Sequence, residues 1–371
     1  MSEWREITLG DYIKTNNESI SVNYPYKRIL YLDTGSITSG RIQKLQKMDL
    51  SNAPSRAKRL VRENDIVYSA VRPNQRHFGF MKNPQSNLVV STGFIVISCD
   101  SSQLFPRYLF YYLTSDRSVE YLHSIAEGST SAYPSLKPTD VETLRITLPP
   151  LPEQRAIAEV LSALDDKIDL LHRQNQTLEA LAQTLFRQWF IEEVEDDWEE
   201  GVLGDLVEFH YGKGLLQSIR TGSGYPVVGS SGIVDFHSEF LIEGPGIVTG
   251  RKGTLGKVIY LFENFFPIDT TFYVKTKKDS PNLYFEYFVL KSIGFENMNT
   301  DSAVPGLNRN NALSVGMYIP PQWLITKFNN IVYPLFQKLN TNNSQIRTLE
   351  NLRDTLLPKL MSGEVRVRGG K

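Results

Sequence analysis

Arginine, lysine, amide and hydroxyl side chains gather in turn-forming segments of both halves of the chain. Residues 70–77 follow a strand-like run and carry donors suited to guanine and adenine edges. In the second half, Arg251 and Lys252 stand in a glycine-rich loop at nearly the same place relative to their own strand. Such side chains on loops can enter a DNA groove or hold phosphates. The DNA contacts expected on this basis are Arg56, Lys58, Arg59, Arg72, Asn74, Gln75, Arg76, Ser129, Thr130, Lys213, Arg251, Lys252, Thr254, Asn308 and Arg309.

The alternative interpretation of each of these segments is an ordinary solvated loop. Two basic pairs, Arg72/Arg76 and Arg251/Lys252, occupy equivalent places in the two halves. This equivalence favours them as DNA contacts over the other candidates. Bases are read by side chains that enter a groove, whereas contacts to phosphates carry no sequence information. We expect Arg76 to read a base, and Lys58 to hold a phosphate.

Residue patterns typical of catalysis are absent from the sequence. An adenine methyltransferase needs an Asn/Asp-Pro-Pro-aromatic loop, whereas the two Pro-Pro pairs here follow Leu148 and Ile319. Residues 250–258 come nearest to a phosphate-binding loop, but Val258 stands where the magnesium-binding hydroxyl belongs. The five histidines and Cys99 lack metal-ligand spacing. We therefore predict a chain that catalyses nothing and itself binds no cofactor or metal.

Composition is typical of a soluble globular protein. The chain has 371 residues, of which 41% are hydrophobic and 22% charged, and a formal net charge of −1. The N-terminus is polar, and no apolar run reaches the roughly 18 residues of a membrane span, which favours a cytoplasmic location. The single cysteine, Cys99, excludes an internal disulfide and favours a buried structural role over a reactive thiol.

The chain contains an internal repeat. Its offset varies at first and then stays constant, which indicates variable loops followed by one long rigid element. The matching segments are Trp4 with Trp198 (194 positions), residues 91–96 with 269–274 (178), residues 108–113 with 285–290 (177), and Leu136 with Leu307 (171, constant from there on).

Each half begins with short strand-like runs and ends in a long helical pattern that follows a Pro-Pro pair. This order predicts an α+β fold: two strand-rich domains in an inverted pseudo-twofold repeat, joined by two long helices in an antiparallel coiled coil. The predicted segments are a first strand-rich domain at 1–148, a first helix at 149–191, an acidic linker at 192–200, a second strand-rich domain at 201–319, a second helix at 320–362 and a basic tail at 363–371.

Both long helices carry a coiled-coil seam that is interrupted by one asparagine. The first seam covers residues 157–189 and contains Asn175, and the second covers 328–360 and contains Asn342. Parallel pairing would set each asparagine against an aliphatic residue and leave its amide unsatisfied. Antiparallel pairing sets Asn175 opposite Asn342 and overlaps the two seams over their full length. We therefore predict that these two residues set the register.

Two layers fit this register less well. Arg353 would face Leu164 and must extend its charged group to solvent, and Pro358 should kink the last turn near Leu360. The seam would be about 48 Å long, or about fourteen base pairs of B-DNA. Two unequal recognition domains on such a spacer suit a split, asymmetric DNA target. A scaffold that binds proteins at its two ends is the alternative.

The run of residues 148–158, the leucine-rich helix after it, and the second-half strings 225–234 and 250–256 resemble the specificity (S) subunit of Type I restriction-modification enzymes. The resemblance covers the whole chain. It implies two target-recognition domains that each read one part of a bipartite sequence, with helical spacers between them. The second helix departs from the pattern, because Gln322-Trp323-Leu324-Ile325 lacks the Glu-Gln-Arg of the first.

The same resemblance implies partner subunits that carry the chemistry. These are two copies of an adenine N6-methyltransferase (M) subunit, which bring S-adenosylmethionine, and restriction/translocase (R) subunits, which use ATP and Mg²⁺. We expect the outward faces of the two helices and the acidic linker to bind the M subunits. A recognition subunit of a methyltransferase without a nuclease remains a further alternative.

The near-neutral net charge is the sum of unlike segments. Residues 1–150 carry 18 bases and 14 acids, and residues 322–371 carry 8 bases and 3 acids. Residues 192–200 carry seven acids and no base. Neutrality therefore does not exclude a DNA partner. Residues 201–321 carry 10 bases and 11 acids, so the second domain is not basic, which predicts weak DNA affinity for this chain alone.

Overall fold

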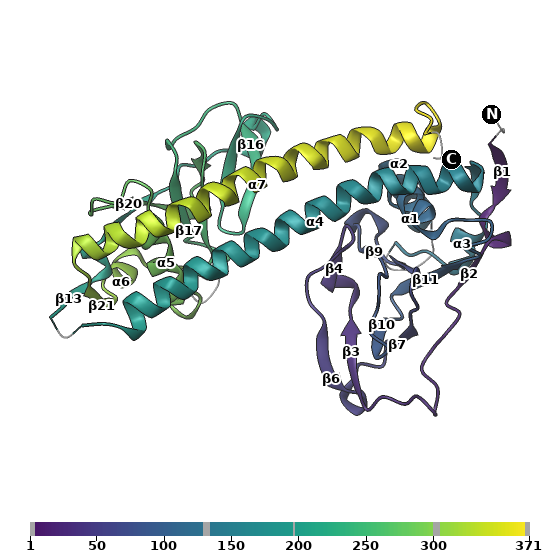
Figure 1. Ribbon diagram of the computed structural model, residues 1–371, viewed down its shortest axis with the longest axis horizontal. Helices are drawn as coiled ribbons and strands as arrows, with labels where there is room; N and C mark the ends of the chain where they lie inside the picture. Colours follow the sequence, from purple (N-terminus) through teal and green to yellow (C-terminus); the bar gives the residue numbers. More distant parts are fainter. Residues whose placement is uncertain (1–3, 129–133, 196, 300–304, 368–371) are drawn as a thin grey trace. The chain divides into compact units, whose positions relative to one another are not determined.

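The computed structural model describes residues 4–128, 134–195, 197–299 and 305–367 (Figure 1). The chain divides into two compact units, here called unit 1 (residues 1–168 and 348–371) and unit 2 (residues 169–347). Two of the expected contact residues, Ser129 and Thr130, lie outside the described residues. No helix of the described part is long and apolar enough to cross a membrane.

Unit 1 contains two four-stranded sheets, a two-stranded sheet and a small hairpin. Buried aliphatic and aromatic residues fill the space between one sheet and the helices. The first four-stranded sheet has the order β6 (Gln46–Asp49), β3 (Arg28–Leu32), β10 (Leu88–Ser91), β7 (Ala57–Leu60), and the second has the order β2 (Ile13–Thr15), β11 (Phe94–Cys99), β8 (Ile66–Ser69), β9 (Phe78–Phe80). The two-stranded sheet pairs β1 (Arg5–Thr8) with β12 (Arg145–Leu148), and the hairpin pairs β4 (Ile37–Thr38) with β5 (Arg41–Ile42). The short helices are α1 (Pro106–Thr114), α2 (Asp116–Glu127) and α3 (Pro138–Glu142).

Unit 2 repeats this plan with fewer strands. Its core is rich in phenylalanine and tyrosine. The four-stranded sheet has the order β14 (Val207–Tyr211), β20 (Thr271–Thr276), β17 (Gly246–Gly250), β18 (Val258–Leu261). The three-stranded sheet has the order β16 (Gly232–His237), β15 (Tyr225–Gly229), β19 (Phe266–Pro267), and β13 (Glu199–Val202) pairs with β21 (Gly316–Ile319). The short helices are α5 (Tyr284–Ile293) and α6 (Arg309–Leu313).

The two units share one topology. The sheet β14-β20-β17-β18 repeats β2-β11-β8-β9, and β13-β21 repeats β1-β12. Strand β15 pairs in parallel with β19 and antiparallel with β16, as β3 pairs with β10 and β6. The α+β organisation expected from the sequence, with two strand-rich halves and two long helices, is confirmed.

Strand pairing corrects the repeat alignment by one residue. The match between β11 and β20 is 177 positions (96 to 273) instead of the 178 expected, because equivalent strands pair as Val67–Val96 and Val248–Tyr273. A shift of one residue reverses the face on which each strand side chain lies. Phe272 therefore occupies the place of Ile95, in the core cluster that includes the helices, and not that of Phe94.

The long helices are α4 (Leu151–Arg187) and α7 (Gln322–Ser362), which run side by side in opposite directions (Figure 1). In unit 1 the first part of α4 packs with the last part of α7, and Ile157, Leu161 and Leu360 share one core. In unit 2 the remaining parts pack together around Phe328 and Val332. Every seam position is buried or half-buried, as the apolar pattern predicts.

Arg353 behaves differently from expectation, and the kink expected at Pro358 stays a prediction. Arg353 does not depend on solvent, because its guanidinium donates to Asp165 at 3.0 Å and to Asp354 at 2.9 Å. The helix continues through Pro358 for another turn to Ser362, and Leu360 is buried. A proline this close to the end of a helix removes one backbone hydrogen bond, and the buried Leu360 side chain still holds the turn in place.

Asn175 and Asn342 are hydrogen-bonded across the helix pair within unit 2. Asn342 Nδ2 donates to Asn175 Oδ1 at 2.9 Å, as the seam pattern predicts. Asn175 Nδ2 donates in turn to Asn343 Oδ1 at 2.8 Å, a partner that the pattern misses because Asn343 lies beside the seam. Asn342 is fully buried, so this pair specifies which layers of the two helices can meet.

Substituting Asn342→Leu is expected to lower the free energy of unfolding by about 1 kcal/mol, because Asn175 Oδ1 loses its donor. Adding Asn175→Leu should raise the free energy of unfolding again by at least the same amount, because two leucines pack well in an apolar seam. Urea unfolding followed by far-ultraviolet circular dichroism measures both effects. The pair would contribute nothing if the single and double variants were equally stable.

Amide side chains of the long helices hold the short helices of each unit. Gln154 is buried, and its Oε1 accepts from the backbone N–H of Phe105 at 2.7 Å, directly before α1. In unit 2 the helix lacks this glutamine, and Asn329 Oδ1 accepts from the N–H of Phe285 in α5 at 3.0 Å. The missing Glu-Gln-Arg is therefore replaced by another amide one turn later.

One segment, the acidic linker, differs from the boundary inferred from charge. Glu199 and Glu200, placed in the acidic linker, belong to strand β13 and pair with β21. The tail after α7 is not free in its first residues, because Arg366 Nη2 donates to Glu153 Oε2 at 2.6 Å and its guanidinium lies 5.4 Å from the ring centre of Trp4. Backbone pairing and a buried carboxylate outweigh the tendency of like charges to remain solvated.

Candidate functional site

In unit 1, the loop after β8 holds two arginines in left-handed backbone conformations. Arg72 has φ 49° and Arg76 has φ 57°, on either side of the one-turn helix η4 (Pro73–Gln75). The loop is fixed to the segment before α3, since Ala70 O accepts from Leu136 N at 2.7 Å. Such conformations are costly for arginine and persist only where the surrounding structure imposes them. The loop is a rigid platform, with Arg72, Asn74 and Gln75 exposed.

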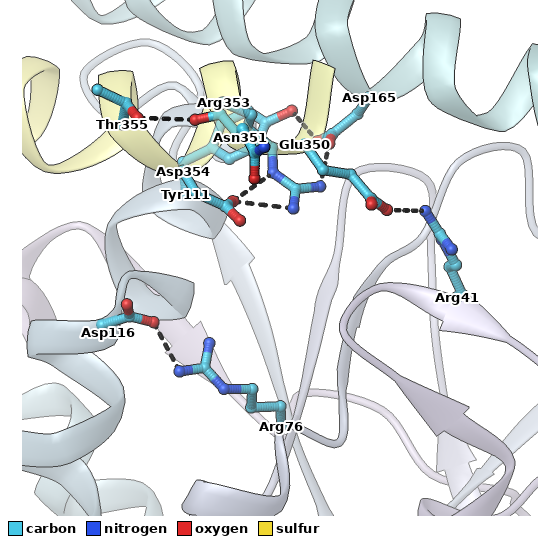
Figure 2. Close-up of polar contacts among 10 residues, drawn as sticks. All are labelled: Arg41, Arg76, Tyr111, Asp116, Asp165, Glu350, Asn351, Arg353, Asp354 and Thr355. Carbon is cyan, nitrogen blue, oxygen red and sulfur yellow. Dashed lines mark hydrogen bonds and ion pairs between the residues drawn. The ribbon is translucent and has the colours of Figure 1, made fainter. Parts of the chain in front are cut away.

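Arg76 is paired with an acid. Its Nη2 lies 2.6 Å from Asp116 Oδ1, at the start of α2, and Figure 2 shows the guanidinium directed at this carboxylate. Asp116 is largely exposed. The ion pair is therefore accessible to solvent, and an incoming anion can compete with Asp116 for Arg76.

The basic residues of β7 lie next to this loop. Arg56 O accepts from Thr92 N at 2.8 Å, and Gly93 O accepts from Ala70 N at 2.8 Å, so one turn joins β7 to the start of the loop. Arg56 is paired with Asp33 at 2.7 Å, whereas Lys58 is exposed. Burial lowers the pKa of the Arg59 guanidinium. Its side chain is half-buried, whereas Arg56 and Lys58 are exposed, so Arg59 is the least accessible of the three to a phosphate.

In unit 2, the loop after β17 has the same backbone connections. Arg251 O accepts from Leu307 N at 2.9 Å, and Gly253 N donates to Pro305 O at 2.9 Å. These bonds repeat those from Leu136 N to Ala70 O and from Arg72 N to Pro134 O.

This alignment gives the residue-by-residue equivalence of the two loops. Because residue 70 matches 251, Arg72 corresponds to Gly253, which also has a positive φ of 84°. Strand pairing after the loop sets Phe78 against Val258, so Arg76 corresponds to Gly256, which has a positive φ of 80°. Arg251 and Lys252 correspond to Ala70 and Val71. The two loops are equivalent in backbone, but their cations occupy different positions.

Arg251 and Arg309 come together on an aromatic ring that the sequence analysis missed. The two guanidinium carbons lie 4.9 and 5.6 Å from the ring centre of Tyr211, at the end of β14. Arg251 Nη1 also donates to Asp269 O at 2.9 Å. Tyr211 gave no signal in the sequence because it is far from both arginines along the chain and belongs to no motif.

The remaining candidates of unit 2 differ in role. Asn308 Oδ1 accepts from the N–H groups of Asn310 and Asn311 at 2.9 and 3.1 Å, so it caps α6. Lys213, Lys252 and Thr254 are exposed. The structure therefore leaves these three side chains accessible and gives Asn308 a structural task.

The long helices hold each loop-bearing domain by carboxylates. In unit 1, Asp165 accepts from Tyr111 Oη at 2.6 Å and from Arg353 at 3.0 Å, and Glu350 pairs with Arg41 at 3.2 Å (Figure 2). These contacts tie β5 and α1 to the two helices, so the domain cannot rotate freely on them.

In unit 2, Glu179 of α4 has the same function. It accepts from Tyr287 Oη at 2.5 Å and Lys291 Nζ at 2.8 Å. Burial alone would raise its pKa, but these hydrogen bonds outweigh burial and lower it. The carboxylate is therefore charged at neutral pH.

Metal-ligating and thiol side chains were the remaining candidates for a reactive group. The described residues contain no group of three or more histidine, cysteine, aspartate or glutamate side chains that could hold a metal ion. Burial raises the pKa of the Cys99 thiol to about 12, so it carries no thiolate at neutral pH.

Comparison with known proteins identifies one family. The family described as "Type I restriction modification DNA specificity domain" matches residues 1–180 and 195–325. The chain is 33% identical over 192 residues to the Type I restriction enzyme HindI specificity subunit of Haemophilus influenzae, covering 52% of this chain and 42% of that protein. It is 29% identical over 303 residues to the MjaIX specificity subunit of Methanocaldococcus jannaschii, covering 70% and 69%.

A solved structure shows the same fold. The crystal structure of a Type I restriction-modification S subunit from M. genitalium matches with a TM-score of 0.60 and 21% identity, over 96% of each chain. At this level of identity the likeness concerns the fold alone.

Proposed function

The chain belongs to the Type I restriction-modification DNA specificity family, and we propose that it reads a two-part asymmetric DNA sequence, with one part bound by each unit. This proposal depends on one observation about two equivalent loops, the loop after β8 in unit 1 and the loop after β17 in unit 2. The same backbone hydrogen bonds present cationic side chains in both units. Their different positions on the loop would give the two units different base preferences.

The proposal assigns no catalysis to this chain. Adenine N6-methylation, with S-adenosylmethionine, belongs to two methyltransferase subunits, and ATP-driven translocation and cleavage, with Mg²⁺, belong to restriction subunits. The chain directs both activities by choosing the DNA. Arg72, Asn74, Gln75 and Arg76 in unit 1, and Arg251, Lys252 and Arg309 in unit 2, are the proposed readers, with Arg56, Lys58, Lys213 and Thr254 on the DNA backbone.

Selection of bound duplexes from a random DNA pool tests the proposal. The full chain is assembled with its methyltransferase subunit, and bound DNA is sequenced after several rounds at moderate salt. We expect a split motif with two unlike halves and a constant gap. A pool that stays random at every salt concentration would favour a protein-binding scaffold instead. Methylation without restriction in the full set of neighbouring gene products would indicate a methyltransferase without nuclease.

Substituting Asp116→Asn should strengthen DNA binding about threefold, because it removes the carboxylate that competes with DNA for Arg76. The gain should shrink as salt is raised, and fluorescence anisotropy on the selected duplex measures it. Glu120→Gln, on the same helix α2, removes an equal charge and is the matched control. An equal gain from both variants would mean that only net charge matters and that the Arg76 pair has no special role.

A further inference from the structure

Tyr211 is an exposed aromatic side chain at the meeting point of three segments of unit 2. It ends strand β14 and is 52% exposed. The loop after β17 brings Arg251 to its ring, and the start of α6 brings Arg309. These residues are distant in sequence, so only the fold brings them together.

The ring has a fixed position. Tyr211 pairs with Phe272 across the sheet, and their ring centres are 5.1 Å apart. Phe272 is fully buried. The next residue, Gly212, leaves no room for a side chain, because a Cβ there would lie 2.1 Å from Ile268 O. A ring held in this way can in turn limit the conformations of groups that rest on it.

Two cations on one ring are an arrangement that needs a reason. Arginines repel each other, and each gains only a modest attraction from a partly exposed tyrosine. The hydrogen bond from Arg251 Nη1 to Asp269 O further restricts that guanidinium. Holding both side chains in advance reduces the entropy that binding must otherwise cost. A phosphate tolerates many arginine orientations, whereas a base edge requires one; the restriction therefore favours base reading.

Unit 1 lacks all three members of this cluster. Val207 pairs with Thr276 as Ile13 pairs with Cys99, so counting on from these strands sets Tyr211 against Asn17, two residues after β2 ends. The loop alignment sets Arg251 against Ala70, and the constant offset of 171 sets Arg309 against Pro138. The aromatic residue and both cations are thus present together in one unit and absent together in the other, as expected of groups that act together.

We propose that Tyr211 is a positioning residue for base recognition by unit 2: its ring holds Arg251 and Arg309 so that the pair reads guanine edges in one half of the target. This inference rests on the proposed DNA-reading function. It adds that guanine preference in that half depends on an aromatic ring that is not itself a hydrogen-bonding reader.

The test uses the full chain with its methyltransferase subunit and a random-sequence duplex pool. Arg251→Ala and Arg309→Ala should each remove a guanine preference in the same half of the selected motif. Tyr211→Leu should weaken both preferences, with a loss of discrimination on the order of tenfold. Tyr211→Phe should keep them, because the ring remains. The salt dependence of binding should change little in both tyrosine variants, since no cation is removed.

A second variant protects the test against misfolding. Tyr211→Asn introduces the residue type that unit 1 has at the corresponding place, two residues after β2 ends, and thermal unfolding of each variant shows whether the unit is intact. The inference is overturned if folded Tyr211→Leu and Tyr211→Asn chains select the native motif, or if Tyr211→Phe fails as they do. If the arginine variants keep the native motif, the assignment of this loop as a reader fails. If the native complex selects no motif, the proposed function itself fails.

Discussion

Phe336→Ala is expected to destabilise unit 2 by about 3–5 kcal/mol, which is the usual cost of removing a buried phenylalanine. Phe336 lies on α7, is 2% exposed, and its ring centre is 4.5 Å from that of Tyr284 and 5.0 Å from that of Tyr260. These rings join the helix to α5 and β18. Loss of the central ring leaves a cavity where the recognition domain meets its helices.

The functional consequence should be confined to one half of the target. Unit 1 has its own core, to which Phe336 does not belong, so hydrogen exchange should rise in unit 2 while unit 1 stays protected. DNA selected by the variant should keep the first half of the motif and lose the second. Tyr333→Ala, at an exposed position on the same helix, is the control and should change stability by less than about 0.5 kcal/mol. Equal exchange in both units would show that they unfold as one.

Arg76→Ala is expected to weaken binding by about 1–3 kcal/mol on the selected duplex and to relax selectivity at one position of the first half. The loop geometry favours this outcome, because the left-handed backbone at Arg72 and Arg76 sets where the Arg76 side chain leaves the loop before DNA arrives. Equilibrium binding to duplexes that differ at single positions measures the change.

Lys58→Ala is the matched contrast. Its side chain is exposed on β7, and its removal should reduce affinity for specific and random DNA alike. The slope of log affinity against log salt should fall by about 1. Equal losses on specific and random DNA for both variants would refute the division between a base reader and a phosphate contact.

Much of the architecture could be predicted because it is encoded in periodic patterns. The seam from Ile157 and the constant offset of 171 identify two similar long helices, and a single asparagine in each gives the pairing that places Asn342 Nδ2 2.9 Å from Asn175 Oδ1. Buried layers repeat every three or four residues along a helix, and that spacing is visible in one dimension. The family resemblance depends on local strings of the same kind.

The loops could be located but not assigned residue by residue. The sequence placed donors after β8 and β17 at nearly the same place relative to their strands, but only the hydrogen bonds show that Arg72 matches Gly253. Strand β20 was displaced by one residue. When a short strand differs on both faces between the two units, its sequence can be aligned equally well one residue to either side. Only cross-strand pairing determines the register.

The sequence by itself therefore determined the repeat, the helix pair with its asparagine register, and the segments that carry the cations. Only the tertiary structure decided which side chains meet: Arg76 with Asp116, Arg366 with Glu153, and Arg251 and Arg309 on Tyr211. Helical seams depend on neighbours three and four residues away, whereas these contacts join residues that are tens to hundreds of positions apart. Their geometry follows from sheet register and loop conformation, which no local pattern encodes.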